Sequence, residues 1–513
     1  MEGTEHTTGT MVLHGRREIV CAPRDVTPSD AWEVVQRALE AHAPNAADED
    51  YLHRYFLGDQ PVLRRVKDVR PDIRNVVVEN RAYQICKDRA DALAGEPIAY
   101  SAHANGRSHG DDVEAMADKV SHAVQRLNDA CDAADKHACD LELVQWMCEC
   151  GVGYRLVLPT PGMPADRPIS VRCLDPRVTF VVRSNDVWRE PVMGVTWVVD
   201  EVTLEPVYTC YTATRAMVLR GGRVVSDSPN PLGMVPIVEY RANSERMGVF
   251  EPVLTLLDSI NEVESNRVDG IAQFVQSLMV LENVELESED GQDDAATVRD
   301  MLRLGCIQIR STDESHASVS MLTSELNQDQ TQTLVDSMYK TVLSICGMPF
   351  NVGGSGSTSD TGAAVTMRDG WSNSESRCKE TEAHFKRGER LFVEACCRIL
   401  RASEGLELSP RDVEVKFTRR NYEAIQSKTQ VLTTLLGSGR VHPRLAFEHC
   451  GMFADPEAAY DLSQQYVLGS GNQGNPGGDA ASDGTDVGGD VNAAGKGTRP
   501  PSTKRSDRRD YQE

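Results

Sequence analysis

Residues 247–350 constrain the fold of this chain more than any other stretch. Two segments with strong helical periodicity, 249–278 and 324–346, flank an acidic insert that lacks this period. The first would be a helix of roughly 28 residues and about 40 Å, with Pro252 in its first turn. In the second, we expect Leu334, Met338, Val342 and Ile345 to share one face. A small-residue loop and a longer helical pattern follow, an order that is unusual for an enzyme.

Local sequence patterns also predict strands, helices and loops in the insert and in the C-terminal third of the chain. Within the insert, residues 281–286 and 306–310 are strand-like, 287–294 form an acidic run and 295–304 a short helix. Gly353–Gly362 is a glycine-serine loop, and 363–400 is predicted to be one helix of about 55–60 Å, with Gly388 as a candidate kink. A strand at 413–418 and helices at 422–436, 443–450 and 456–468 follow. From residue 469 the chain is too polar to fold.

The N-terminal half predicts an α+β domain. Residues 1–26 have no clear period and are expected to be a flexible arm. A helix is predicted from Thr27, which has proline after it and Asp30 three residues on. Further helices are expected at 80–94 and, in two pieces, at 111–150. Short β-branched runs separated by turns then predict an antiparallel meander at 153–158, 169–174, 178–183, 192–199, 207–212 and 235–240.

Composition narrows the class of protein. The formal charge of −24 argues against a broad basic face that grips nucleic acid, but an acidic wall would let nucleic acid slide past. The fourteen cysteines show no paired zinc spacing and are expected to be reduced and mostly buried. The N-terminus does not have the order of a signal peptide, and no apolar run approaches the roughly 18 residues of a membrane helix.

No catalytic, cofactor-binding or metal-binding constellation is evident. The glycine-serine loop lacks the lysine that a phosphate-binding Walker loop needs. The acidic run misses calcium-loop spacing, and charge runs are usually solvated. Neither HExxH nor GxSxG occurs. We therefore expect a protein that is not an enzyme.

Several strings, taken in order, resemble the portal proteins of tailed bacteriophages with long non-contractile tails. The resemblance covers about residues 29–468. The residues that carry it are Tyr51, Tyr55, Phe56, Gly58 and Asp59; Asn80, Ile85, Gly95, Pro97, Ile98 and Tyr100; Gly151, Gly153 and Tyr154; Leu174-Asp175-Pro176; Phe250-Glu251 and Leu257–Asn261; Phe417–Asn421; and Asp455-Pro456-Glu457. The first arm, the tail and the loop sequence lie outside the match.

The resemblance implies a portal fold with an antiparallel-sheet and helix wing, a two-helix stem, a small α/β clip, a long helix and a helical crown. Its implied divisions are the arm 1–26, wing 27–245, first stem helix 246–278, clip 279–323, second stem helix 324–349, tunnel loop 350–362, long wing helix 363–404, crown 405–468 and disordered tail 469–513.

It also implies partners and a location. Portal proteins form a ring, commonly of twelve subunits, at one capsid vertex. Double-stranded DNA is packaged and ejected through this ring. Implied partners are the terminase large subunit, major capsid and scaffold proteins and a head-tail adaptor, in the virion and, during assembly, the host cytoplasm.

Candidate contact residues follow from these roles. The tunnel-loop candidates for DNA are Gly353, Gly354, Ser355, Gly356, Ser357, Thr358 and Ser359, whose hydroxyls can meet phosphates without a lysine. Candidate DNA-facing basic residues are Arg267, Arg303 and Lys340. Glu287, Glu289 and Asp290 are candidates for terminase docking. The alternative is a capsid-vertex or adaptor protein that conducts no DNA.

Overall fold

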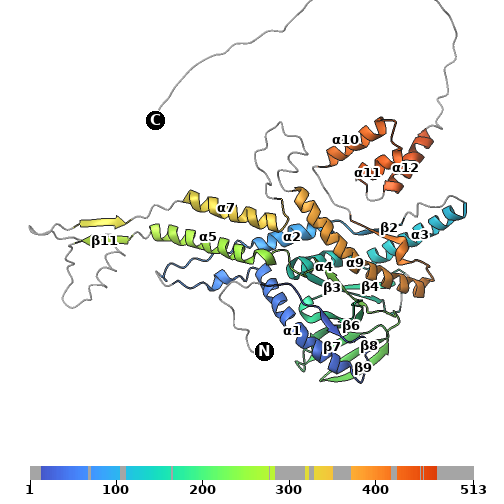
Figure 1. Ribbon diagram of the computed structural model, residues 1–513, viewed down its shortest axis with the longest axis horizontal. Coiled ribbons are helices and arrows are strands. Elements are labelled where there is room, and N and C mark those ends of the chain that lie inside the picture. Colours follow the sequence, from blue (N-terminus) through green and yellow to red (C-terminus); the bar gives the residue numbers. More distant parts are fainter. Residues whose placement is uncertain are drawn as a thin grey trace, which may run out of the picture. The chain divides into compact units, whose positions relative to one another are not determined.

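A computed structural model describes residues 13–67, 71–103, 111–162, 164, 166–275, 278–282, 318–322, 328–349, 371–417, 424–450, 452–453 and 456–470 (Figure 1). The chain divides into two units, Met1–Pro456 and Glu457–Glu513. Helices and sheets are mixed in the first unit, which confirms the α+β class.

The helices agree closely with the predicted segments. They are α1 (Ala31–Phe56), α2 (Arg81–Ala94), α3 (Asp111–Ala133), α4 (Lys136–Cys150), α5 (Leu254–Val275), α7 (Gln328–Ile345), α9 (Trp371–Glu404), α10 (Ala424–Gly437), α11 (Pro443–Cys450) and α12 (Pro456–Ser470), with short 3-10 turns η1 (Pro61–Arg64), η2 (Pro176–Val178), η3 (Glu251–Val253) and η4 (Pro410–Asp412).

In the described residues, four sheets accompany the helices. The strands are β1 (Ile19–Cys21), β2 (Ala99–Ala102), β3 (Val152–Pro159), β4 (Ile169–Leu174), β5 (Thr179–Ser184), β6 (Pro191–Val199), β7 (Pro206–Tyr211), β8 (Arg215–Arg220), β9 (Arg223–Pro229), β10 (Ile237–Arg241), β11 (Leu278–Glu282), β12 (Ser318–Leu322) and β13 (Val413–Lys416). Their order is β1-β5-β6-β7-β8-β9, β10-β3-β4, β11-β12 and β13-β2.

The six-stranded sheet holds three strands of the predicted meander, β5, β6 and β7, to which β1, β8 and β9 are added. The other three predicted strands, β3, β4 and β10, form a separate sheet, so the single meander was wrong. Strands β5 to β9 are antiparallel, whereas β1 joins the edge parallel to β5. The sequence reading omitted β8 and β9, because β9 is largely exposed and lacks apolar alternation. Gly221-Gly222 between them, both with positive φ, is the hairpin signal that was overlooked.

Two predictions for the N-terminal region are wrong in part. From residue 13 onward the expected arm is packed: Leu13 and Ile19 are buried, and Ile19 pairs with Val182. The helix expected from Thr27 begins at Ala31 and continues through Pro44 to Phe56. Tyr51, Tyr55 and Phe56 therefore belong to it. Of the predicted capping box only the reciprocal bond is present, since Thr27 N donates to Asp30 Oδ1 at 2.7 Å. The N-cap residue is Asp30, and its side chain makes no capping hydrogen bond.

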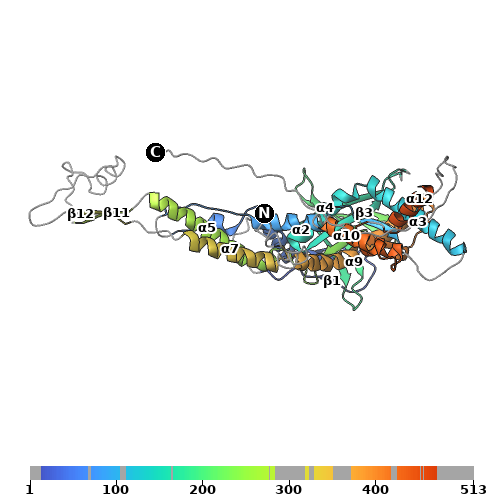
Figure 2. The same ribbon diagram turned by 90° about the horizontal axis from the view of Figure 1, so that it is seen from above.

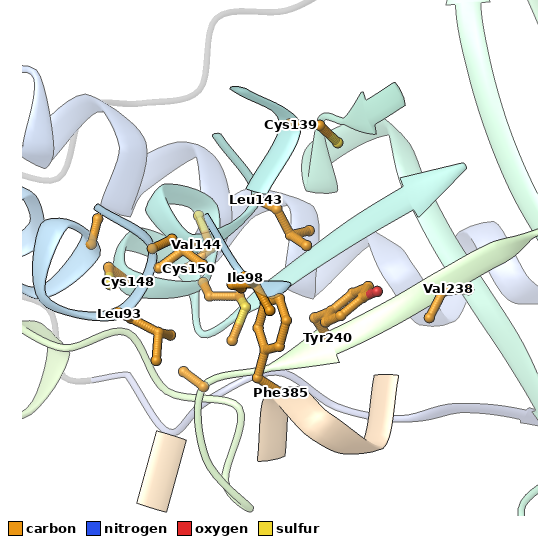
Figure 3. Close-up of a cluster of buried hydrophobic side chains, with 14 of the residues drawn as sticks. Leu93, Ile98, Cys139, Leu143, Val144, Cys148, Cys150, Val238, Tyr240 and Phe385 are labelled. Atoms are coloured by element: carbon orange, nitrogen blue, oxygen red, sulfur yellow. The ribbon is translucent and has the colours of Figure 1, made fainter. Parts of the chain in front are cut away.

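The main core lies where α2, α4, β3, β10 and α9 meet (Figure 3). Leu143, Tyr240 and Phe385 are fully buried there. Gly388 in α9 provides close approach, because a Cβ at this position would lie 2.8 Å from the Tyr240 ring. All cysteines in the described part are free thiols and most are buried, as predicted.

Two cations and two carboxylates are buried at the centre of this core. Lys136 and Asp140 come from α4, Arg155 from β3 and Glu389 from α9, and none is more than 3% exposed. Lys136 Nζ lies 2.5 Å from Asp140 Oδ2 and 3.0 Å from Glu389 Oε1. Arg155 bridges the same two carboxylates, contacting Asp140 and lying 3.0 Å from Glu389 Oε2. We call these four residues the charge quartet; its formal charge is zero.

Two tyrosines complete the coordination of Glu389. The hydroxyl of Tyr100 on β2 donates to Oε1 at 2.5 Å, and that of Tyr240 on β10 donates to Oε2 at 2.7 Å. Burial alone would raise the pKa of Glu389. The charges of Lys136 and Arg155, together with the two hydroxyls, outweigh burial and lower this pKa to about 2.

Replacing Glu389 with Gln should therefore destabilise the protein strongly. Removing one partner of a buried pair leaves an uncompensated charge, so we expect the free energy of unfolding at neutral pH to fall by about 3–5 kcal/mol. Because the folded-state pKa is below the ordinary 4.5, this contribution is complete above pH 4.5 and is lost as pH falls toward 2. Urea unfolding from neutral pH downward should show wild type and variant converging in acid.

The matched control is Glu394→Gln on the same helix. Its carboxylate lies 2.6 Å from Arg398 at the surface, and both side chains are more than a third exposed. We expect a loss of less than about 1 kcal/mol. Equal losses for the two variants would contradict the assigned importance of the quartet.

Candidate functional site

Helices α5 and α7 pack side by side and form a pair that continues into a small sheet (Figures 1 and 2). Strand β11 follows α5, β12 precedes α7, and the two strands pair antiparallel from Leu278↔Leu322 to Glu282↔Ser318. Residues 283–317, which separate the two paired strands in sequence, lie outside the described residues. The first predicted helix is too long, because Leu278 begins β11.

One face of α5 carries a ladder of polar side chains. Asn261, Ser265 and Asp269 are buried and four residues apart. They accept hydrogen bonds from the backbone N–H groups of three alternate residues in the extended segment 73–80: Glu79 to Asn261 Oδ1 at 3.0 Å, Val77 to Ser265 Oγ at 3.0 Å, and Asn75 to Asp269 Oδ1 at 2.7 Å.

The three hydrogen bonds can form together because the spacing of the acceptors on α5 matches the spacing of the donors on the segment. Four residues of helix advance about 6 Å, and two residues of extended chain advance about 6.6 Å. An acceptor every fourth residue of α5 therefore meets a donor every second residue of the segment. At its end, Asp269 Oδ2 also lies 3.1 Å from Lys67 Nζ and 3.3 Å from Arg65 Nη2. Segment 73–80 is thus fixed along α5 without belonging to any sheet.

The root of α5 rests directly on α4. A Cβ at Gly248 would lie 2.2 Å from the Glu149 carbonyl oxygen, and one at Gly151, where φ is +81°, would lie 2.3 Å from that of Arg246. Glu251 in the first turn accepts from Gly248 N at 2.8 Å and from Arg16 Nη2 at 2.7 Å. Substitutions at these glycines would force the root of α5 away from the core.

The root of α5 also holds α1. The hydroxyl of Tyr55 donates to Asp258 Oδ1 at 2.8 Å, and its ring stacks on Phe250 at 5.7 Å between centroids. Strings far apart in the sequence, around residues 55, 80 and 258, therefore meet along this helix. These are among the strings that suggested the portal resemblance.

The apolar residues predicted to share one face of α7 are only partly buried. Val335, Val342 and Leu343 are buried, whereas Leu334 is 52% exposed and Ile345 is 44% exposed. The predicted face is therefore divided, because periodicity cannot distinguish an apolar residue that meets the core from one that faces outward. On α5, Ile271 is likewise 53% exposed.

The sequence matches the model of one family, described as "Phage portal protein, SPP1 Gp6-like", over residues 39–465. This match covers most of the chain. The chain belongs to the phage portal proteins. A comparison with curated proteins gave no match.

As a member of this family, the protein is a structural component of the virion capsid and takes part in genome packaging. It implies a homo-oligomeric ring associated with capsid and DNA. No helix in the described ranges is long and apolar enough to cross a membrane. Nor do three His, Cys, Asp or Glu side chains in these ranges gather as metal ligands would.

The candidate contact residues of this portal protein fall into two groups. Arg267 lies on α5, where Nη1 is 2.7 Å from Glu264 Oε1 and donates to Gln332 Oε1 of α7 at 2.9 Å, so it ties the helical pair together. Lys340 is exposed on α7. Outside the described residues lie Arg303, the acidic candidates Glu287, Glu289 and Asp290, and the loop residues 353–359.

The sequence reading missed the ladder residues of the portal helix pair. The available signal was a row of small polar residues at four-residue spacing within a mostly apolar helix. Such a row is more often a solvated face. Only the position of segment 73–80, which is remote in sequence, identifies it as a buried contact.

Replacing Asp269 with Ala should release segment 73–80 from α5. The change leaves the Asn75 N–H and two cations without their acceptor, so we expect a loss of about 2–4 kcal/mol in stability. Hydrogen exchange at residues 75–79 should accelerate by at least about tenfold, since each factor of ten corresponds to about 1.4 kcal/mol of opening.

Glu262→Gln is the control for this change. Its carboxylate also contacts Arg65, at 3.4 Å, but the side chain is 48% exposed. Exchange in the segment should stay within about twofold of wild type. A similar acceleration in both variants would show that the ladder does not hold the segment.

Proposed function

We propose that α5 and α7 are the stem of the portal ring and line the channel through which double-stranded DNA is packaged and ejected. The supporting observation is the distribution of apolar surface on this pair. The inner faces are already occupied by the ladder and by the core, yet Ile271, Leu334 and Ile345 remain about half exposed. Exposed apolar groups on both helices are what a subunit interface requires.

The spacing of the exposed residues suits a ring. Leu334 and Ile345 are eleven residues apart, about three helical turns, so they project from nearly the same side of α7. A ring is closed by a heterologous interface, in which one surface of each subunit meets a different surface of the next. The stripe on α7 and Ile271 on α5 are such a pair of surfaces.

The remaining divisions follow the same proposal. Residues 27–245 are the wing, 279–323 the clip, 350–362 the tunnel loop, 363–404 the long wing helix and 405–468 the crown. The arm is shortened by the packed residues from 13 onward. The clip, with Glu287, Glu289 and Asp290, is the proposed docking site for a terminase that supplies the motor.

DNA contact is proposed to be weak and independent of sequence. Arg267 is engaged within the helix pair, so Lys340 is the better candidate for a phosphate contact on the described helices. The tunnel-loop hydroxyls provide further contacts without the charge of a lysine. An acidic, hydroxyl-rich wall limits adhesion of phosphates.

The ring interface is tested by the double change Leu334→Glu and Ile345→Glu. Charges on the exposed stripe should abolish assembly and leave the monomer folded, because both side chains are solvated in the single chain. Negative-stain microscopy of wild type should show rings with a central hole, and mass photometry should show only monomers for the variant.

Val202→Glu is the matched control, since Val202 is 92% exposed on the β6–β7 turn and receives the same change of chemistry. It should assemble normally. Solid particles or monomers from the wild-type protein would favour an adaptor that conducts no DNA. Normal rings from the double variant would place the interface elsewhere.

The tunnel loop is tested by replacing residues 354–359 with a bulky basic string. Tight charge pairing with passing phosphates should slow translocation, so packaged DNA should fall at least about tenfold while ring assembly is unchanged. A replacement of the same length with alternating Gly and Ser is the control. Undiminished packaging by the basic variant would remove the loop from the channel.

A further inference from the structure

A cavity of about 320 Å³ lies beside the root of the stem, away from the proposed channel residues. Its walls come from α2, α4, the connection before α5, the end of α7 and the first part of α9. Apolar side chains including Leu93, Val144 and Ile345 form much of the lining. Its two cations are Arg89 and Arg377 and its two carboxylates Glu245 and Glu380, of which Glu380 is paired with Arg377. The volume is within the range of about 300–1,000 Å³ typical of small-ligand pockets.

Arg89 differs from the other buried arginines. The described ranges contain five of them: Arg16, Arg89, Arg155, Arg183 and Arg246. Four lie within ion-pair distance of a carboxylate, as in Arg16–Glu251 at 2.7 Å and Arg183–Glu239 at 2.8 Å. In the part of the chain that the structure describes, Arg89 has no carboxylate at such a distance, although it is only 8% exposed.

The contacts of Arg89 are neutral. Nη1 donates to Cys378 Sγ and Nη2 to Thr381 Oγ1, both at 3.3 Å, and both acceptors line the cavity. Two further thiols in the wall cannot balance the charge near neutral pH, because burial raises the pKa of Cys148 and of Cys346 to about 12. The guanidinium is therefore a buried positive charge with no negative partner on the described chain.

Such a charge is costly unless an anion approaches it. Each terminal nitrogen of Arg89 carries a second hydrogen beyond the one that it donates to Cys378 or Thr381, and a guanidinium fork matches the two oxygens of a carboxylate or phosphate. We propose that this cavity is an anion-binding site, in which Arg89 receives a carboxylate or phosphate group and the apolar wall receives the short body that carries it.

The occupant would join separate elements. Arg89 belongs to α2, Ile345 and Cys346 to the end of α7, and Cys378 and Thr381 to α9. An anion held there would therefore link the stem to the wing helices. Two sources share this chemistry: a free small anion, or an acidic side chain of a second copy of this chain. The second source rests on the proposed ring.

The first measurement uses full-length, unassembled protein and inorganic phosphate as the probe. Calorimetry should show about one phosphate per chain, and phosphate at about twenty times Kd should raise Tm by about 2 °C or more relative to chloride at equal ionic strength. Arg89→Met should abolish both effects. Arg398→Met on α9 should retain them, because Arg398 is not among the residues that line the cavity and is paired with Glu394 at 2.6 Å at the surface.

Assembled rings then distinguish the two sources. If a neighbouring carboxylate fills the site, phosphate binding should disappear in the ring, and Arg89→Met should lower the assembled fraction at least about fivefold. A free anion should instead bind in both states. Either result supports the site.

The proposal is overturned if unassembled wild type does not bind phosphate, or if Arg89→Met, folded by circular dichroism, binds it equally. Should Arg89→Met not fold, Arg89→Lys keeps the charge without the fork, and undiminished phosphate affinity in that variant would overturn the proposal. Because the first measurement needs no ring, its failure is separate from a failure of the stem assignment.

Discussion

Glu389 is the group on which the arrangement of the first unit most depends. It is a fully buried carboxylate, and its charge is tolerated because Lys136, Arg155 and two tyrosine hydroxyls surround it. These partners come from α4, β3, β2 and β10. A shift of α9 by one residue would turn Glu389 by about 100° and leave both cations short of a partner. The quartet therefore fixes the rotation and position of α9 against the sheet more narrowly than apolar packing could.

This fixed core determines where the stem begins. The α4 helix carries Lys136 and Asp140 near its start, and its last residues lie beneath Gly248 at the root of α5. From that root the ladder fixes the position of α5 against segment 73–80, with one backbone hydrogen bond for every four residues of the helix. Both devices use buried polar groups with defined partners, which specify direction as well as proximity. The helix pair is thereby oriented by the core of the first unit and does not rely on contact between α5 and α7 alone.

The sequence predicted most elements but not their partners. Periodicity and end signals located α2, α4, α11 and most strands, because these depend on neighbouring residues. The quartet escaped prediction because Lys136, Arg155 and Glu389 look like surface charges until three remote segments are brought together. Likewise, apolar spacing identified α7 and grouped Leu334 with Val342, but it did not show that Val342 is buried and Leu334 exposed. Whether a stripe faces its own core or another subunit is decided by tertiary structure and assembly.

Two features around α5 and α7 have a common physical basis. A folded monomer would normally cover apolar stripes and pair its buried charges, and the quartet shows that this chain can pair charges well. Yet Ile271, Leu334 and Ile345 stay half exposed, and Arg89 faces a cavity with neutral contacts. Both features involve α7, directly or through the cavity wall at Ile345. The single chain therefore has exposed apolar surface and an uncompensated buried charge in the same region. Contact with a neighbouring subunit and binding of an anion there would lower the free energy of the folded chain. Such a subunit gains stability by assembling, and a ring is the closed form in which every subunit gains it equally.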